Sequence, residues 1–423
     1  MKIFLDSIGC RLNQSEIESY ARKFLEAGHE LTHNAVEADI AVINTCAVTS
    51  DAAADSRQRI RKVAKAGGAA LVLTGCLSSL DPVALASFPQ VIDIVPNEVK
   101  DDLVERVLEK QVAPKNKTVW FDTGRYRTRA FIKVQDGCDN RCTYCVTRVA
   151  RGRGRSVPTQ SVLEDVQAAI GTGVKEIVLT GVHLASWGKD FSPRKKLKDL
   201  VRYILDESPV DRLRLSSVEP WDLDDSFFDL WQDRRLCRHL HLPLQSGGKR
   251  ILRRMARNTT TEKYRKLVES ARAKIPELAV TTDVIVGFPG ETDADFEESL
   301  IFVRGMQFSG GHVFMFSPRE GTAAADFPDK VASAAMKERS RLMQQLLADS
   351  ETQYKSQFVG TKQQVLWEHS RKQVAEKWLL PGLTDNYLRI TAHSQENRWN
   401  QFDFVLLQDL TTDGLHGEII NEH

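Results

Sequence analysis

The chain has 423 residues, with 42% hydrophobic and 27% charged residues. These values are ordinary for a globular protein and exclude disordered, collagen-like and disulfide-scaffold classes, and the length predicts about three domains. Because 58 Lys and Arg residues face 57 Asp and Glu residues, the net charge is only +1 and any basic surface has to be local.

Neither a secretion signal nor a membrane span is expected. Asp6 interrupts the first apolar stretch, and no apolar run approaches the roughly 18 residues that a span requires. We therefore expect a cytoplasmic protein with no membrane partner. Its seven cysteines are better interpreted as metal ligands, catalytic groups or buried thiols than as disulfides.

Strand-like runs alternate with amphipathic helical stretches in the first part of the chain, residues 1–110. The runs are 2–5, 40–43, 70–73 and 91–95. This rhythm predicts βα units that form a parallel sheet. Residues 111–128 include Pro114 and show no apolar periodicity, which indicates a linker.

Six more strand-like runs follow between residues 129 and 354. They are 130–134, 176–179, 213–216, 239–242, 279–286 and 312–316. The helical stretches between them are 161–170, 197–205, 261–274 and 294–304. Repeated βα units of this number favour a full or partial α/β barrel, whose functional sites lie at the carboxyl ends of the strands.

The last part of the chain, residues 355–421, has a different pattern. After a polar helix near 333–354, short β-like runs at 363–367, 387–391 and 403–407 are separated by Gly, Asn and Asp. This pattern of short strands predicts a small β-barrel of the OB-like kind.

The most informative local motif is Gly137-Cys138-Asp-Asn-Arg-Cys142-Thr-Tyr144-Cys145, directly after the first barrel strand. Three thiolates on one loop can hold three irons of a 4Fe–4S cluster and leave the fourth iron without a protein ligand. A structural zinc site is the alternative, but it requires four ligands and the loop offers no fourth Cys or His.

Cys10, Cys46 and Cys76 each follow a strand of the N-terminal sheet. Because the carboxyl ends of parallel strands share one edge, these residues can converge into a second site with three thiolates. The alternative is three buried structural thiols, which does not explain why all three follow strands in the same way. Cys237 is expected to be a thiol of the core.

A CxxxCxxC loop at the mouth of an α/β barrel resembles the radical S-adenosylmethionine (SAM) enzymes. Further stretches carry a closer resemblance: Ile43-Asn-Thr-Cys46-Ala-Val-Thr49, Val178-Leu-Thr-Gly181, Leu215-Ser-Ser217-Val-Glu219-Pro220, His241-Leu-Pro-Leu-Gln245-Ser-Gly247 and Val286-Gly-Phe-Pro-Gly-Glu291. Together with two sets of three cysteines, they resemble the methylthiotransferases. The resemblance implies a flavodoxin-like N-terminal domain, a partial (β/α)6 radical SAM barrel and a C-terminal RNA-binding TRAM module.

The stretch after Cys46, with Ala-Asp-Ser-Arg57-Gln58, resembles the branch that acts on N6-threonylcarbamoyladenosine at position 37 of tRNA, beside the anticodon. The implied product is its 2-methylthio derivative. Alternatives are the same chemistry on isopentenyladenosine or on a ribosomal-protein aspartate, or a non-catalytic iron–sulfur RNA-binding protein.

The resemblance also implies cofactors and roles. Two 4Fe–4S clusters are expected, a radical SAM cluster on Cys138, Cys142 and Cys145 and an auxiliary cluster on Cys10, Cys46 and Cys76. Two SAM molecules are consumed per turnover, one as methyl donor and one cleaved to the radical that abstracts hydrogen from C2 of adenine. The implied partners are tRNA, an electron donor such as flavodoxin or ferredoxin, and an unidentified sulfur donor.

Other predicted site residues lie near strand ends or in basic stretches. The expected cofactor contacts are Tyr144, Thr180, Gly181, Ser217, Glu219, Gln245, Val286 and Gly287. Residues 125–155 contain nine Lys and Arg against two acids, and the expected RNA contacts are Arg148, Arg151, Arg153, Arg155, Tyr387 and Arg389. His183, His239, His241 and His312 are interpreted as core or rim histidines without a role.

Overall fold

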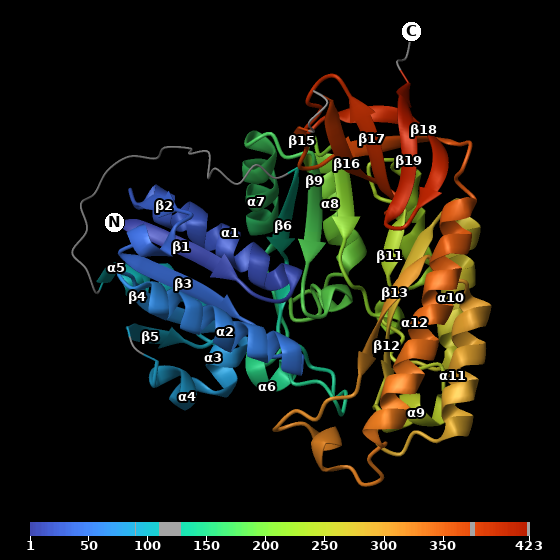
Figure 1. Cartoon of the computed structure of the whole chain (residues 1–423), viewed down its shortest axis with the longest axis horizontal. Helices are drawn as coiled ribbons and strands as arrows, with labels where there is room; N and C mark the ends of the chain where they lie inside the picture. The colour runs from blue at the N-terminus through green and yellow to red at the C-terminus, as the bar shows by residue number, and fades with distance from the viewer. Residues whose placement is uncertain (89, 110–127, 373–376, 421–423) are drawn as a thin grey trace.

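A computed structural model describes residues 1–88, 90–109, 128–372 and 377–420 of the chain. Figure 1 shows an N-terminal sheet, a central half-barrel and a small C-terminal barrel. Most of the predicted linker 111–128 lies outside the described residues. In the described part of the chain, no helix combines the length and the apolarity that crossing a bilayer requires.

The N-terminal sheet is parallel, with the strand order β2-β1-β3-β4-β5. Its strands are β1 (Lys2–Ser7), β2 (Glu30–Thr32), β3 (Ile40–Thr45), β4 (Ala70–Gly75) and β5 (Val91–Val95). Its helices are α1 (Arg11–Glu26), α2 (Ser50–Ala66), α3 (Cys76–Leu80), α4 (Pro82–Ala86) and α5 (Leu103–Glu109). Every residue of β3 is buried, as expected for a central strand covered on both faces. The order is that of flavodoxin-like folds, so the predicted fold class is confirmed here.

The central region contains the six predicted strands in two parallel three-stranded sheets, β10-β9-β6 and β11-β12-β13. The strands are β6 (Arg129–Lys133), β9 (Glu176–Thr180), β10 (Arg212–Leu215), β11 (His239–His241), β12 (Ala279–Val286) and β13 (Gly310–Met315). Isolated parallel bridges, Leu213 to Leu236 and Ser217 to His241, connect the two sheets. The result is a partial barrel, as predicted.

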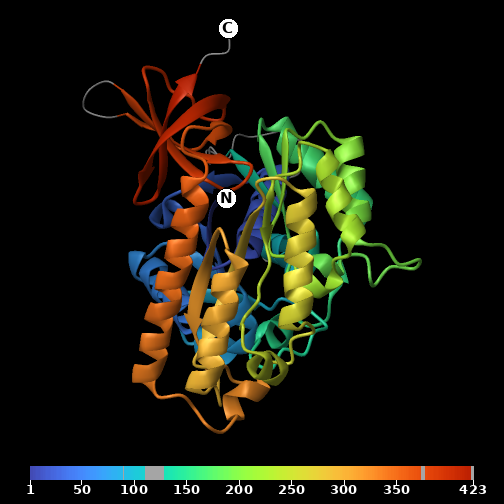
Figure 2. The same ribbon diagram turned by 90° about the vertical axis from the view of Figure 1, so that its right-hand side faces the viewer.

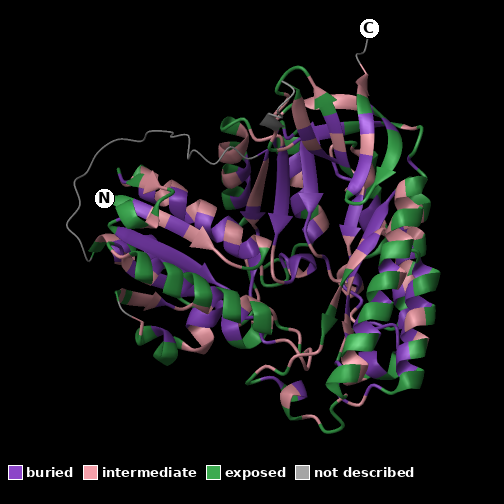
Figure 3. Cartoon of the chain, viewed as in Figure 1, coloured by how far each residue is buried: buried purple, intermediate pink, exposed green. Residues whose placement is uncertain are grey.

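Helices cover the outside of this half-barrel, as Figure 2 shows. They are α7 (Thr159–Gly171), α8 (Leu197–Glu207), α9 (Lys249–Arg254), α10 (Thr261–Lys274), α11 (Asp293–Met306) and α12 (Ser333–Ser356). The strands β9 and β10 are buried, whereas the outer faces of the helices are exposed (Figure 3). The apolar face of each helix therefore packs on the sheet and its polar face meets solvent.

The C-terminal strands are β14 (Lys362–Trp367), β15 (Arg371–Lys372), β16 (Trp378–Thr384), β17 (Arg389–Ser394), β18 (Phe402–Thr411) and β19 (Gly414–Ile420). They follow the order β14-β18-β19-β17-β16-β15, and β14 also pairs with β16. This additional pairing closes five strands into the predicted small barrel. Trp367 and Val405 are fully buried in its core.

Arginines of the half-barrel hold the C-terminal barrel against the amino ends of their strands. Arg212 Nη1 donates to the Leu383 carbonyl at 2.9 Å, and Arg214 Nη2 donates to that of Thr384 at 3.1 Å. Arg238 forms an ion pair with Asp385 at 2.6 Å. The C-terminal barrel therefore lies at the end of the half-barrel opposite the carboxyl ends of the strands (Figure 1).

Candidate active site between two cysteine groups

The first cysteine group lies on the loop that joins β6 and the short strand β7 (Gln135–Asp136) to helix α6 (Thr147–Arg151). All three thiols, Cys138, Cys142 and Cys145, are half-buried. The Cys138 amide donates to the Gly152 carbonyl at 3.1 Å, and the Cys145 amide donates to that of Cys142 at 3.1 Å. These backbone bonds fold the loop into a compact turn at the carboxyl edge of β6.

Gly137 explains why the loop can turn there. Its φ is +67°, and a Cβ at this position would lie 1.9 Å from the Arg153 carbonyl oxygen. Only glycine tolerates both the left-handed backbone and the close approach. The residue before Cys138 therefore positions the first thiol.

The three thiols of this loop lie within each other's electrostatic field. Burial raises the pKa of the Cys145 thiol, and the neighbouring Cys142 and Cys138 raise it further. Arg257 Nη1 lies 3.9 Å from Cys142 Sγ and supplies a positive charge. Tyr144 packs against a separate buried cluster that includes Ile251 and Phe288.

His183, to which the sequence assigned no role, lies beside this group. Its Nδ1 is 3.8 Å from Cys138 Sγ, and its Nε2 is 2.7 Å from Asp222 Oδ2 and 3.6 Å from Glu219 Oε2. Burial alone would lower the pKa of His183, but the hydrogen bonds to Asp222 and Cys138, followed by the charge of Glu219, outweigh burial and raise it to about 10. The imidazole therefore holds a positive charge against a thiol. The only sequence signal was its place shortly after a barrel strand.

The second cysteine group lies at the carboxyl edge of the N-terminal sheet. Cys10 precedes α1, Cys46 follows β3, and Cys76 begins α3 directly after β4. Because β1, β3 and β4 are neighbours in the sheet, these three positions converge as expected. Burial raises the pKa of the Cys46 thiol to about 11, and the nearby Cys10 and Cys76 thiols add to the rise.

Arg151 connects the two groups. Its Nε donates to Cys76 Sγ at 3.3 Å, and its Nη1 lies 2.9 Å from Glu16 and 3.0 Å from Asp136, two residues before Cys138. Its Nη2 also donates to Asn13 Oδ1 at 2.6 Å. The prediction of an RNA contact at Arg151 is wrong, because the side chain is only 2% exposed and is used inside the protein.

Ion pairs complete this buried contact between the N-terminal sheet and the half-barrel. Lys100 pairs with both Glu16 and Asp136, and its side chain is 1% exposed. Two cations therefore face two carboxylates in the interior. The sheet is fixed by charge, so that its cysteine edge faces the cysteine loop of the barrel.

The other predicted RNA contacts divide into two kinds. Arg148, Arg153, Arg155 and Arg389 are exposed. Tyr387, by contrast, stacks on His239 with ring centroids 4.2 Å apart, and Arg11 Nη2 donates to its hydroxyl at 2.7 Å. The expected RNA contact at Tyr387 is therefore corrected, because this ring belongs to the contact that seats the C-terminal barrel.

The predicted cofactor contacts lie along the carboxyl ends of the barrel strands. Thr180 ends β9, Ser217 pairs with His241, Gln245 pairs with Val284, and Gly287 follows β12. Glu219 is buried beside His183, and burial raises the pKa of its carboxyl. Gln245 adopts a φ of +76°, an unusual conformation for a residue other than glycine. These residues lie at the same edge as the cysteine loop.

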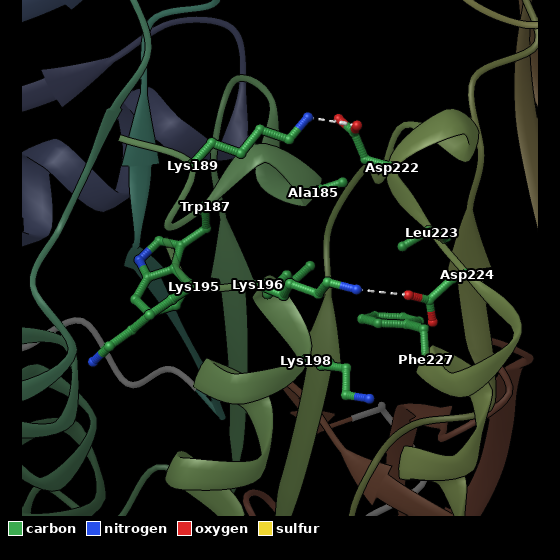
Figure 4. A pocket seen from close by; sticks show the side chains of 11 residues that line it. Ala185, Trp187, Lys189, Lys195, Lys196, Lys198, Asp222, Leu223, Asp224 and Phe227 are labelled. Atoms are coloured by element: carbon green, nitrogen blue, oxygen red, sulfur yellow. Dashed lines mark hydrogen bonds and ion pairs between the residues drawn. The ribbon is translucent and has the colours of Figure 1, made fainter. Parts of the chain in front are cut away.

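A small hollow lies on the rim next to His183 (Figure 4). Lys189, Lys195, Lys196 and Lys198 contribute to its wall, opposite Asp222 and Asp224. Lys189 Nζ lies 2.5 Å from Asp222 Oδ1, so one carboxylate bridges this lysine and His183. With four lysines against two aspartates, this hollow is basic.

The donor sets fit iron–sulfur clusters better than a single metal ion. Among the described residues, no three His, Cys, Asp or Glu side chains are grouped as one metal ion would require. A 4Fe–4S cluster makes a different demand, because each thiolate binds its own iron atom around a larger body. Two groups of three thiols, each beside a cation, satisfy that demand.

Comparison with known families gives two matches. Residues 132–303 match the radical SAM superfamily, and residues 2–96 match a family described as uncharacterized protein family UPF0004. The first match contains the CxxxCxxC loop and most of the barrel strands. The second contains Cys10, Cys46 and Cys76.

Similar curated proteins carry two kinds of name. "Threonylcarbamoyladenosine tRNA methylthiotransferase MtaB" of Thermotoga maritima is 33% identical over 97% of this chain and 95% of its own, and that of Bacillus subtilis is 32% identical over 92% and 90%. A "tRNA-2-methylthio-N(6)-dimethylallyladenosine synthase" of Geobacillus kaustophilus is 31% identical over 100% and 82%.

Among solved structures, the radical SAM methyltransferase TsrM from Kitasatospora setae, with cobalamin and a [4Fe-4S] cluster bound, is similar. The TM-score is 0.57 at 15% identity, and the match covers 77% of each chain. At this identity the likeness shows the fold alone.

Proposed function

This chain belongs to the radical SAM methylthiotransferases and is related to MtaB, and we propose that its substrate is N6-threonylcarbamoyladenosine at position 37 of tRNA. The family acts on tRNA and uses SAM and 4Fe–4S clusters. The proposed product is the 2-methylthio derivative. The reductant would be an external one-electron donor such as flavodoxin or ferredoxin.

One observation carries this proposal: two groups of three thiols lie on facing edges and are joined by a single buried arginine. A nucleobase that receives a sulfur substituent has to reach a site for hydrogen abstraction and a site for sulfur delivery in one binding event. A single cluster would not need the second thiol group. Relatives named for threonylcarbamoyladenosine reach 33% identity over almost the whole chain, which supports the choice of base.

The proposed roles follow from the positions. Cys138, Cys142 and Cys145 would hold the cluster that binds SAM, and Cys10, Cys46 and Cys76 would hold the auxiliary cluster. When bound, these groups supply one-electron cleavage of SAM and the sulfur for transfer. The chain's own residues position them: Gly137 shapes the first loop, and Arg151 holds the two cysteine edges together.

Several cations prepare the two thiol groups for metal. Thiols bind metal only as thiolates, and a nearby positive charge favours that form. Arg151 Nε lies 3.3 Å from Cys76 Sγ, and Arg257 Nη1 lies 3.9 Å from Cys142 Sγ. His183 Nδ1 lies 3.8 Å from Cys138 Sγ. Each cysteine group therefore receives at least one cation from a buried or half-buried side chain.

The test is nucleoside mass spectrometry of tRNA from cells with and without this gene. The proposal expects 2-methylthio-N6-threonylcarbamoyladenosine to disappear and its unmethylthiolated precursor to accumulate. A deletion strain that expresses the Cys138→Ala variant as its sole copy should show the same nucleoside change as the deletion. If the 2-methylthio derivative of isopentenyladenosine disappears instead, the substrate is that of the dimethylallyl relatives. If no methylthio nucleoside changes, tRNA is not the substrate.

A further inference from the structure

A loop that follows β13, residues 316–329, contacts residues beside both cysteine groups. The Ala324 amide donates to the carbonyl of Thr143, which lies between Cys142 and Cys145, at 2.8 Å. Near its start, Ser317 Oγ lies 2.6 Å from Ser50 Oγ at the beginning of α2, four residues after Cys46. Figure 1 shows this loop, in orange, reaching from the barrel toward α2 and α6. It therefore joins the surroundings of the two cysteine groups.

Arg319 is the one basic residue of this loop. Its Nη2 donates to Ser50 Oγ at 3.1 Å. Burial lowers the pKa of Arg319, and the charge of the Cys46 thiol, the next largest influence, raises it. The guanidinium is therefore held beside the predicted sulfur-delivery site.

The Nε–H of Arg319 has no acceptor among the described residues, although the atom is shielded from solvent. No ion pair forms between Arg319 and any described carboxylate, whereas nearby Arg57 pairs with Asp81 at 3.3 Å. A shielded donor without an acceptor costs free energy. An anionic ligand that accepts from Nε and Nη2 side by side would remove that cost.

We propose that Arg319, with the hydroxyls of Ser50 and Ser317, forms a subsite for the carboxylate of the threonylcarbamoyl group. This inference rests on the proposed substrate. The threonylcarbamoyl substituent ends in a carboxylate and carries a hydroxyl, whereas the dimethylallyl substituent has neither. A guanidinium binds a carboxylate through two parallel hydrogen bonds, and the half-buried guanidinium of Arg319, whose Nε–H lacks an acceptor, disfavours an apolar group. Arg319 would therefore select one base over the other.

The experiment measures equilibrium binding of the reconstituted full-length protein to anticodon stem-loop RNAs that differ only at position 37. The three RNAs carry N6-threonylcarbamoyladenosine, its carboxylate methyl ester, or isopentenyladenosine. Wild-type protein should bind the free acid about tenfold to a hundredfold more tightly than the other two, the range that charge-assisted hydrogen bonds provide. The ester tests the subsite without changing the protein.

Arg319→Gln should bring the three affinities together by weakening only the free acid, and Arg319→Lys should retain part of the preference. The matched control is Lys337→Gln on the exposed side of α12, which should bind all three RNAs as wild type does. If Arg319→Gln keeps the full preference for the acid over the ester, the inference is overturned while the proposed substrate stands. If wild-type protein prefers the isopentenyl RNA, the proposed substrate fails, and the carboxylate subsite fails with it.

Discussion

Arg151→Met is the sharpest test of how the two cysteine groups are held together. The substitution keeps a side chain of similar length but removes the guanidinium. Four contacts disappear, to Cys76 Sγ, Glu16, Asp136 and Asn13. Three of these acceptors belong to the N-terminal sheet and its helices, and Asp136 belongs to the half-barrel.

The structure gives the magnitude. In the wild type, Arg151 and Lys100 balance Glu16 and Asp136, whose side chains are 1% and 5% exposed. After the substitution, Lys100 alone faces two buried carboxylates. Removing one partner from a buried ion pair costs about 3–5 kcal/mol. If this cost falls on the contact between the sheet and the barrel, its equilibrium shifts by about a hundredfold to several thousandfold.

The assay is amide hydrogen exchange along α1 and β6, which lie side by side at this contact. Arg151→Met should speed exchange in both elements by roughly the factor given above. The control is Arg153→Met, because Arg153 lies on the same segment with its side chain 90% exposed. Equal protection in the two variants would refute the claim that Arg151 fixes the orientation of the N-terminal sheet.

Three further predictions concern the cysteines, a glycine and a histidine. Cys138→Ala should abolish the release of 5′-deoxyadenosine from SAM, whereas Cys46→Ala should keep that release but lose the methylthio product. Cys237→Ala is the control for both, because Cys237 is a buried free thiol outside the two groups. Full methylthiolation by Cys46→Ala would exclude an auxiliary cluster on that thiol. Gly9→Ala should lower the iron content of reconstituted protein by about half, because its Cβ would lie 2.4 Å from Cys46 Cβ. Gly67→Ala, also at positive φ but with nothing within 4 Å, should retain full iron. Equal iron in both variants would show that the close contact between residue 9 and Cys46 does not matter. Burial, followed by the charges of Arg214, His241 and Arg11, holds the pKa of His239 well below its usual range. Below about pH 6.5 the unfolded chain therefore binds a proton that the folded chain does not. The free energy of unfolding then falls by up to about 1.4 kcal/mol per pH unit as the pH drops. Urea midpoints at pH 7.5 and 5.5 should differ less for His239→Gln than for wild type, and an equal difference would contradict this linkage.

The strands that the sequence did not predict are short or interrupted. β2 has three residues, none of them buried, so it lacks an apolar run. β16 contains Pro381 and Gly382, and β19 contains Gly417, residues that weaken a strand pattern. The missed strands still pair because their neighbours in the sheet provide hydrogen bonds, which no local pattern encodes.

The sequence by itself determined the elements whose signal is local. Apolar periodicity identified the four main strands of the N-terminal sheet and the six strands of the half-barrel, because a buried strand needs apolar side chains wherever it lies. The spacing of Cys138, Cys142 and Cys145 indicated one loop, and the positions of Cys10, Cys46 and Cys76 after parallel strands indicated one edge. Both arrangements follow from backbone geometry over short distances.

Tertiary structure decided which charges and rings meet. Arg151 was interpreted as an RNA contact because it lies in a basic stretch, yet it is buried against Glu16, 135 positions away. Tyr387 meets His239 and Arg11 in the same way, across domains. Composition shows that a guanidinium or a ring is present but not whether protein or solvent surrounds it. That choice depends on how separate elements dock, and docking is set by the sum of many contacts that no single stretch contains.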